Sequence, residues 1–173
     1  INLIKYYNEA DNTWPSLYDV NSVPFGANYF VKGKGYLVVP DNDDTNILFT
    51  GTINTGTIPV DVSVSTSTNP SKAGYNLVGN PYPSYLDWTA VYAANSAKLA
   101  NSTMWYRTKS GSYTFWTVNG TSGEGSPATA TKNIAPTQAF WVKAIATDQL
   151  SFTNAMRVPA PADNKLLKAP AHT

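Results

Sequence analysis

Apolar and polar residues alternate in short runs along most of the chain, and Gly, Pro, Asn and Asp separate the runs. The run 139–144 is typical, because an extended backbone places Phe140 and Val142 on one side and Trp141 and Lys143 on the other. Short alternating runs bounded by turn residues predict β-strands. The expected strands are residues 3–7, 36–39, 47–50, 58–64, 75–78, 103–107, 113–118, 139–144 and 150–153.

Segment 87–100 departs from this alternation and predicts one short helix. Val91, Tyr92 and Leu99 recur near helical spacing, and Asp87 precedes them where a side chain accepts hydrogen bonds from the free amides of a first turn. Two other segments lack a periodic pattern. Residues 121–131 are expected to form a surface loop, and the Pro- and Ala-rich residues 158–173 a C-terminal linker.

The sequence also contains a diverged internal repeat. Residues 35–38 and 48–50 match residues 139–142 and 151–153, and an aromatic hairpin precedes each copy. A separation of about 100 residues indicates two related halves rather than a solenoid, whose repeats are much shorter. We therefore expect a single domain over 1–157, with halves at about 1–70 and 74–157 packed as a jelly-roll-like β-sandwich. Chance similarity between short aromatic strings is the alternative.

If the halves are related, the segment that opens the second half at Gly74 needs a counterpart in the first half. That counterpart would precede Ile1, or residues 58–64 would take its place.

Composition narrows the class of protein. The 173 residues are 42% apolar and 13% aromatic, which is enough for a hydrophobic core. Charged residues make up 13%, the net charge is +1 and no basic run occurs, so a nucleic-acid partner is not expected. No apolar stretch approaches the roughly 20 residues that cross a bilayer, so membrane insertion is not expected either.

Catalytic chemistry has few candidates. The chain has no Cys, and its one His, His172, lies in the C-terminal segment, which argues against Ser-His-Asp and zinc chemistry. A pair of carboxylates, as in glycoside hydrolases, is the remaining enzymatic alternative and would need two carboxyl groups about 5–10 Å apart across an open groove. We therefore predict a protein that is not an enzyme and has no cofactor.

The densest acidic cluster contains Asp41, Asp43 and Asp44. Its oxygen atoms make it a weak candidate for structural Ca²⁺, but the spacing lacks the Gly and terminal Glu of a helix-loop-helix calcium site. A solvated hairpin turn is the favoured interpretation.

Residues 74–88 read Gly-Tyr-Asn-Leu-Val-Gly-Asn-Pro-Tyr-Pro-Ser-Tyr-Leu-Asp-Trp. Together with segments 105–107, 134–143 and 152–157, this string resembles the GWNLVGNPYPS-type all-β module of secreted and surface proteins of Bacteroidetes. In that family the module often lies near a sorting domain for type IX secretion, beside adhesin-like or glycan-degrading modules. The resemblance implies an extracellular or cell-surface location, and no catalytic residues follow from it.

The prolines of this motif indicate a structural role. Pro81 and Pro83 lack backbone donors and disfavour helix in the residues before them, so the strand must end and turn there. Tyr82 and Tyr85, around the same bend, are candidates for ligand contact.

Three tryptophans are expected on half-polar strand faces. Trp105 shares a face with Arg107, Trp141 shares one with Lys143, and Trp116 follows polar residues on its own face. An indole beside hydrogen-bonding groups can stack on a sugar ring while its neighbours bind the hydroxyls. In the alternative, the rings are covered by the rest of the protein, and the cationic side chains extend over them toward water.

The sequence therefore predicts a non-catalytic module of a larger secreted or cell-surface protein, carbohydrate-binding or adhesive, whose partners are a glycan and neighbouring domains. A structural spacer without a ligand is the alternative, and a glycoside hydrolase is less favoured. Exposed, clustered Trp rings would favour binding, and complete burial would favour the spacer.

Overall fold

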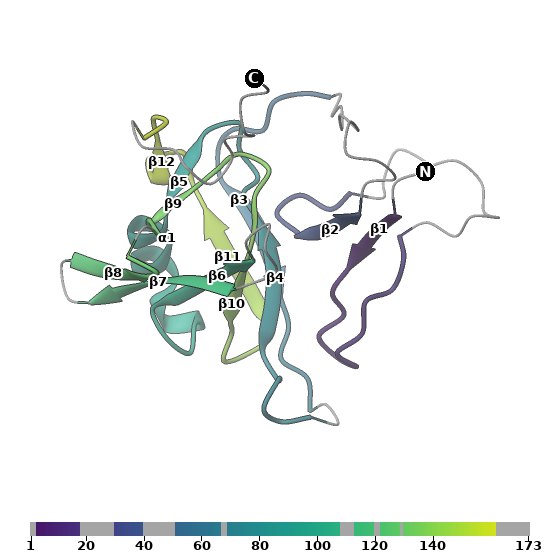
Figure 1. The fold of residues 1–173 in the computed structure, drawn as a ribbon. Helices are drawn as coiled ribbons and strands as arrows, with labels where there is room; N and C mark the ends of the chain where they lie inside the picture. Colours follow the sequence, from purple (N-terminus) through teal and green to yellow (C-terminus); the bar gives the residue numbers. More distant parts are fainter. Residues whose placement is uncertain are drawn as a thin grey trace, which may run out of the picture.

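A computed structural model describes residues 3–17, 30–39, 51–66, 69–107, 113–119, 122–128 and 130–161. Within them the predicted all-β class is confirmed, with twelve strands and one short α-helix, α1 (Trp88–Asn95) (Figure 1). The strands are β1 (Leu3–Tyr6), β2 (Tyr36–Val39), β3 (Ile58–Val62), β4 (Tyr75–Gly79), β5 (Tyr85–Asp87), β6 (Thr103–Arg107), β7 (Tyr113–Asn119), β8 (Ser122–Ser126), β9 (Asn133–Ile134), β10 (Ala139–Lys143), β11 (Asp148–Phe152) and β12 (Arg157–Val158). The strand predicted at 47–50 lies outside the described residues.

The central element is an antiparallel five-stranded sheet with the order β4-β10-β6-β7-β8. The remaining strands form a three-stranded sheet, β12-β5-β9, and two pairs, β1-β2 and β11-β3. Figure 1 shows α1 and the β1-β2 pair on opposite sides of the central sheet. The two faces of that sheet therefore have different neighbours, and the jelly-roll-like sandwich stays a prediction.

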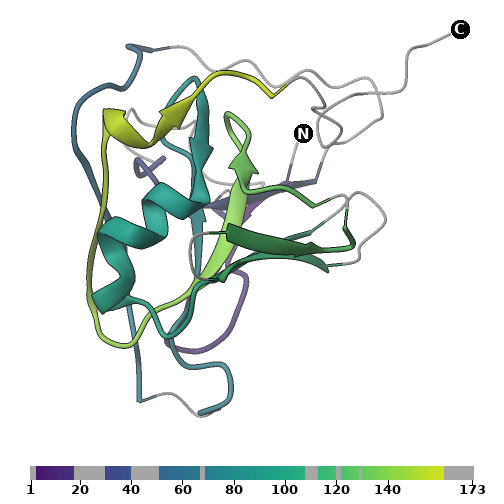
Figure 2. The same cartoon turned by 90° about the vertical axis from the view of Figure 1, so that its left-hand side faces the viewer.

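One face of the central sheet contributes to the hydrophobic core. Phe140 of β10 is 0% exposed and packs edge-on against Trp88 of α1, with ring centroids 5.9 Å apart. It also meets Phe152 of β11. Figure 2 views the molecule from the side of the sheet on which α1 lies. The alternation predicted for residues 139–144 is thus confirmed, because burial of one parity drives the strand against the helix.

The helix begins where the sequence predicts. The Asp87 carboxylate accepts a 2.8 Å hydrogen bond from the Thr89 amide and forms a 2.7 Å ion pair with Lys132. The α-helix ends at Asn95, earlier than the predicted residue 100, and a 3₁₀ turn (Ser96–Lys98) follows. Asn95 is buried, and its amide exchanges two hydrogen bonds with the backbone of Ser151, which ties the end of the helix to β11.

The Asn-Pro-Tyr-Pro bend is organised by the buried side chain of Asn80. Its Nδ2 group donates to the carbonyl oxygens of Ser84, Ile134 and Ala135, and its Oδ1 atom accepts from the amide of Tyr82. Since these partners belong to three segments, one amide connects the end of β4, the bend and β9. The structural interpretation of the motif agrees with this arrangement.

A buried carboxylate fastens the hairpin that follows β1 to the central body. Glu9, 4% exposed, accepts hydrogen bonds from the amides of Ser65 and Gly74, the latter at 2.7 Å, and from the Ser65 hydroxyl. Gly74 has φ +81°, and a Cβ there would overlap the Ala144 carbonyl oxygen. The motif therefore begins with a glycine because both its backbone conformation and the close approach require one.

Three sequence expectations need correction. The loop predicted at 121–131 contains β8, which pairs with β7 although its Ser-Gly-Glu-Gly-Ser sequence has no apolar alternation. Val158, the first residue of the predicted linker, belongs instead to β12. Residues 58–64 do not supply the expected counterpart to β4. That counterpart would pair with β2, whereas β3 pairs with β11.

The strand pairing bears on the internal repeat. β1 pairs with β2 in the same antiparallel way as β6 pairs with β10, as the proposed alignment of the halves requires. The repeat itself stays a prediction. Among the described residues, no helix is long and apolar enough to cross a membrane.

Candidate functional site: an aromatic pocket

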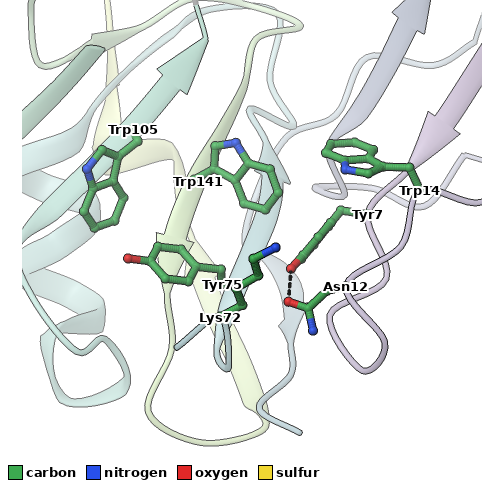
Figure 3. Close-up of a pocket in the computed structure, with 7 residues that line it drawn as sticks. All are labelled: Tyr7, Asn12, Trp14, Lys72, Tyr75, Trp105 and Trp141. Carbon is green, nitrogen blue, oxygen red and sulfur yellow. Dashed lines mark hydrogen bonds between the residues drawn. The ribbon is translucent and has the colours of Figure 1, made fainter. Parts of the chain in front are cut away.

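A pocket of about 350 Å³ lies between the outer face of the central sheet and the hairpin after β1 (Figure 3). Five of its lining residues are aromatic and two are polar. They are Tyr7, Asn12, Trp14, Lys72, Tyr75, Trp105 and Trp141.

Strand register explains why rings from distant segments meet here. Trp141 is directly opposite Trp105 of β6 on one side and Leu77 of β4 on the other. Residues that are directly opposite in an antiparallel sheet lie on the same face, so both indoles point away from the core. Tyr75, two residues before Leu77, joins them on that face.

The rings fall into two contacting groups. Trp141 meets Tyr7 and Trp14 edge-on, with centroids 4.7 Å and 5.8 Å apart. Tyr75 lies 5.7 Å from Trp105 in a tilted arrangement. Contacts at these angles restrain the rings without stacking them face to face. Figure 3 shows Trp141 between the Tyr75–Trp105 pair and the two hairpin rings, Tyr7 and Trp14.

Polar groups border the rings. The Tyr7 hydroxyl donates a 2.9 Å hydrogen bond to Asn12 Oδ1. Burial, followed by the negative charges of Glu9 and Asp11, raises the pKa of Tyr7, so the hydroxyl keeps its proton. Asn12 has φ +59°, a left-handed conformation that Asn tolerates better than most residues. The pocket thus has amide and hydroxyl groups in defined positions.

A second pocket, of about 470 Å³, adjoins the first, since Trp14 and Trp141 line both. It follows the outer face of the sheet toward the other end of β10. Its remaining lining residues are Lys5, Tyr36, Leu37, Leu77, Arg107 and Ala139.

The structure brings together part of the predicted ligand set. Trp105 and Trp141 line the aromatic pocket, and Arg107 lines the adjoining one. Lys143 lies on the same face, with its ammonium 5.0 Å from the centroid of the Tyr75 ring.

Trp116 lies elsewhere. It is opposite Met104, which is 0% exposed, so its side chain points to the core face. Its indole nitrogen is buried and has no hydrogen-bond partner within the described residues. The structure therefore separates Trp116 from the pocket.

Tyr82 and Tyr85 are not placed for ligand contact. They are 2% and 8% exposed. The Tyr82 hydroxyl donates a 2.6 Å hydrogen bond to the Gly56 carbonyl, and Arg157 lies over its ring. Both residues belong to the packing around the bend.

Five lining residues were not among those predicted from the sequence: Tyr7, Asn12, Trp14, Lys72 and Tyr75. A partial signal existed for Tyr75, because Tyr75 and Leu77 alternate along β4 with Asn76 and Val78, which are the buried positions. Nothing local could have placed Tyr7 and Trp14 beside Trp141, because that contact depends on how the first hairpin packs.

No described residue lining either pocket is an Asp or Glu, so the carboxylate pair of a glycoside hydrolase has no support there. Over the described part of the chain, no cluster of His, Asp or Glu could hold a metal ion. Asp41, Asp43 and Asp44, the weak calcium candidate, lie outside the described residues.

The fold and the pocket define an all-β protein with an aromatic cavity on the outer face of its largest sheet. Residues 3–173 match a family model described as Domain of unknown function (DUF8693), and the protein belongs to this family. No curated protein and no solved structure matches the chain significantly. Its function is therefore argued from the pocket.

Proposed function

We propose that the protein is a non-catalytic carbohydrate-binding or adhesive module of a larger secreted or cell-surface protein. The observation that supports this is the aromatic pocket, where Tyr75, Trp105 and Trp141 of three adjacent strands meet Tyr7 and Trp14 of the hairpin. The extracellular location follows from the motif resemblance.

The chemistry of the pocket suits a sugar ring. The C–H groups of a pyranose form an apolar face that packs against an indole or phenol ring, while its hydroxyls need hydrogen-bonding partners. Lys72 supplies a donor at the edge of the rings, and the Tyr7 hydroxyl, which donates to Asn12, has an oxygen that can also accept. A volume of about 350 Å³ is also of the size expected for a small-molecule site.

A structural spacer is the second candidate, and one observation favours it. Trp141 contacts Tyr7 and Trp14 directly, so the same rings also join the hairpin to the sheet. If these rings only join the hairpin to the sheet, the protein binds no glycan. Replacing the rings then lowers the stability of the protein and changes nothing else.

Trp105 provides the cleaner test, because its one described ring contact is with Tyr75 of the same sheet. Affinity electrophoresis and calorimetry against soluble and insoluble polysaccharides would measure binding by the wild type and by Trp105→Ala and Trp141→Ala. We expect each variant to lose about tenfold or more in affinity, the loss from one stacking ring.

Phe115→Ala is the matched control. Phe115 is opposite Trp105 on the same outer face but does not line the pocket, so its removal should leave affinity unchanged. Absence of binding across neutral and acidic glycans would overturn the proposed function. Equal losses in Phe115→Ala and Trp105→Ala would show that the loss is not specific to the pocket and would contradict its assignment as the binding site.

A further inference from the structure

Cationic side chains surround the two adjoining pockets. Lys72 lines the aromatic pocket, Lys5 and Arg107 line its neighbour, and Lys143 lies beside Tyr75. The described residues that line these pockets include no carboxylate. The charged side chains among these described lining residues are therefore all cationic, although the whole chain is nearly neutral, with 12 Lys and Arg against 11 Asp and Glu. A concave surface of one sign attracts ligands of the opposite sign.

The carboxylates near the first hairpin already have partners. Glu9 accepts hydrogen bonds from Ser65 and Gly74, at the base of the hairpin. Asp11 accepts from the amide and the hydroxyl of Thr13, at 3.1 Å and 2.6 Å. Their charges reach the Tyr7 side of the pocket, but neither group lines it. The positive charge of Lys72 is therefore not neutralised by a direct ion pair at the pocket.

Lys72 is well placed for a ligand. It is exposed, and it forms no ion pair with a described residue. Figure 3 shows its ammonium group beside Tyr75 and Tyr7, on the side toward Trp141. A ligand stacked on the indoles would bring its substituents close to this ammonium. Lys143 adds a second positive charge, and its ammonium group lies over the ring of Tyr75.

We propose that the pocket selects an anionic sugar unit, one that has a carboxylate or a sulfate substituent. This inference rests on the proposed function and specifies its ligand class. The sugar ring stacks on Trp105 and Trp141, and the anionic substituent pairs with Lys72 and, less directly, with Lys143. A neutral sugar uses the same rings but gains no ion pair, so it binds more weakly.

Matched ligands test this proposal. Calorimetry would compare an oligogalacturonate with its methyl-esterified form, which keeps the backbone and loses the charge. A sulfated oligosaccharide and its desulfated form make the second arm, which distinguishes a carboxylate from a sulfate source. For at least one pair we expect the anionic member to bind about two- to tenfold more tightly, because each exposed ion pair adds a modest factor and two cations act together.

The variant Lys72→Gln should lose about two- to fivefold in affinity for the anionic member and be unchanged toward the neutral one. The double variant Lys72→Gln/Lys143→Gln should lose more. Raising the salt from 50 mM to 500 mM should abolish the preference, because exposed charges are screened. Lys98→Gln is the control: it removes the same charge from a side chain that pairs with Asp148 and lines neither pocket.

Equal binding of both members in both arms, with Trp105→Ala still weakening it, would overturn this inference and leave the proposed function standing. The inference would also be overturned if Lys98→Gln reduced the preference for the anionic member as much as Lys72→Gln does. The effect would then come from the net charge of the protein and not from the pocket. Failure of every glycan to bind would overturn both proposals.

Discussion

The two faces of the central sheet are made by the same strands but differ in burial and in what they contact. On the core face, Phe140 and Val142 are 0% exposed and pack with α1 and β11. On the outer face, Trp141 is half-buried, and its ring contacts within the described residues are with Tyr7 and Trp14 of the hairpin. Alternation therefore separates the residues that stabilise the fold from those that form a pocket.

The half-buried aromatic rings of the outer face line a pocket and lie outside the core, which supports the binding role proposed above. We therefore expect changes on the core face to alter stability most and changes on the outer face to alter glycan binding most.

The largest effect is expected for Phe140→Ala. Removing a fully buried ring should lower the free energy of unfolding by about 3–5 kcal/mol, because the packed core closes over the cavity only in part. Trp141→Ala, on the adjacent residue, should cost only about 1–2 kcal/mol, since it loses ring contacts at a solvated surface. Chemical denaturation measures both. Equal losses would contradict the distinction between the two faces.

Asn80→Ala should have the next largest effect, about 3 kcal/mol, because three buried carbonyl oxygens lose their donor and the Tyr82 amide loses its acceptor. Urea unfolding would show the loss. Asn101→Ala is the control, since Asn101 is exposed and accepts one local hydrogen bond from the Thr103 amide. If glycan affinity of folded Asn80→Ala protein fell as far as that of Trp105→Ala, the motif would have a direct ligand role.

Glu9→Gln should loosen the hairpin by about 1–3 kcal/mol, because the charge-assisted hydrogen bonds to Ser65 and Gly74 are weakened. Native-state hydrogen exchange should show faster exchange of the β1 and β2 amides, with β10 unchanged. Glycan affinity should fall as well, since Tyr7 and Trp14 are on this hairpin. Asp11→Asn removes the same charge from an exposed site and serves as control. Unchanged protection in Glu9→Gln would show that the rings alone hold the hairpin.

Tyr7→Phe should have the smallest effect. It removes one hydrogen bond to Asn12 and keeps the ring against Trp141, so thermal unfolding should register about 1 kcal/mol or less. We expect glycan affinity to change by less than about twofold, because stacking survives. A larger loss of affinity would make the hydroxyl a direct ligand contact, and Tyr7→Ala would then add little to it.

Much of the local structure was predictable because it depends on near neighbours. The alternation in β10 and in β6 predicted both strands, and Asp87 predicted the start of α1 through a hydrogen bond within two residues. β8 was not predictable, because its Gly-rich sequence forms a strand only by pairing with β7. The short strands β5, β9 and β12 form in the same way, against partners distant in the sequence.

The candidate site was predictable only in part, because alternation within a strand shows which residues share a face but not which face is buried. Trp105 and Trp141 were expected beside polar residues, and they line the pocket. Trp116 shows the same kind of alternation, but register places it opposite Met104 on the core face. Tyr82 is likewise buried by its packing against Gly56 and Arg157.

The sequence by itself determined the all-β class, most strand positions and the helix start, because propensity, alternation and capping act over a few residues. The tertiary structure decided which parity of each strand became core, since a register shift of one residue exchanges the two faces. It also decided that Tyr7 and Trp14 meet Trp141, because the Glu9 carboxylate and strand pairing bring segments far apart in the chain into contact. The pocket exists only where those long-range contacts close it.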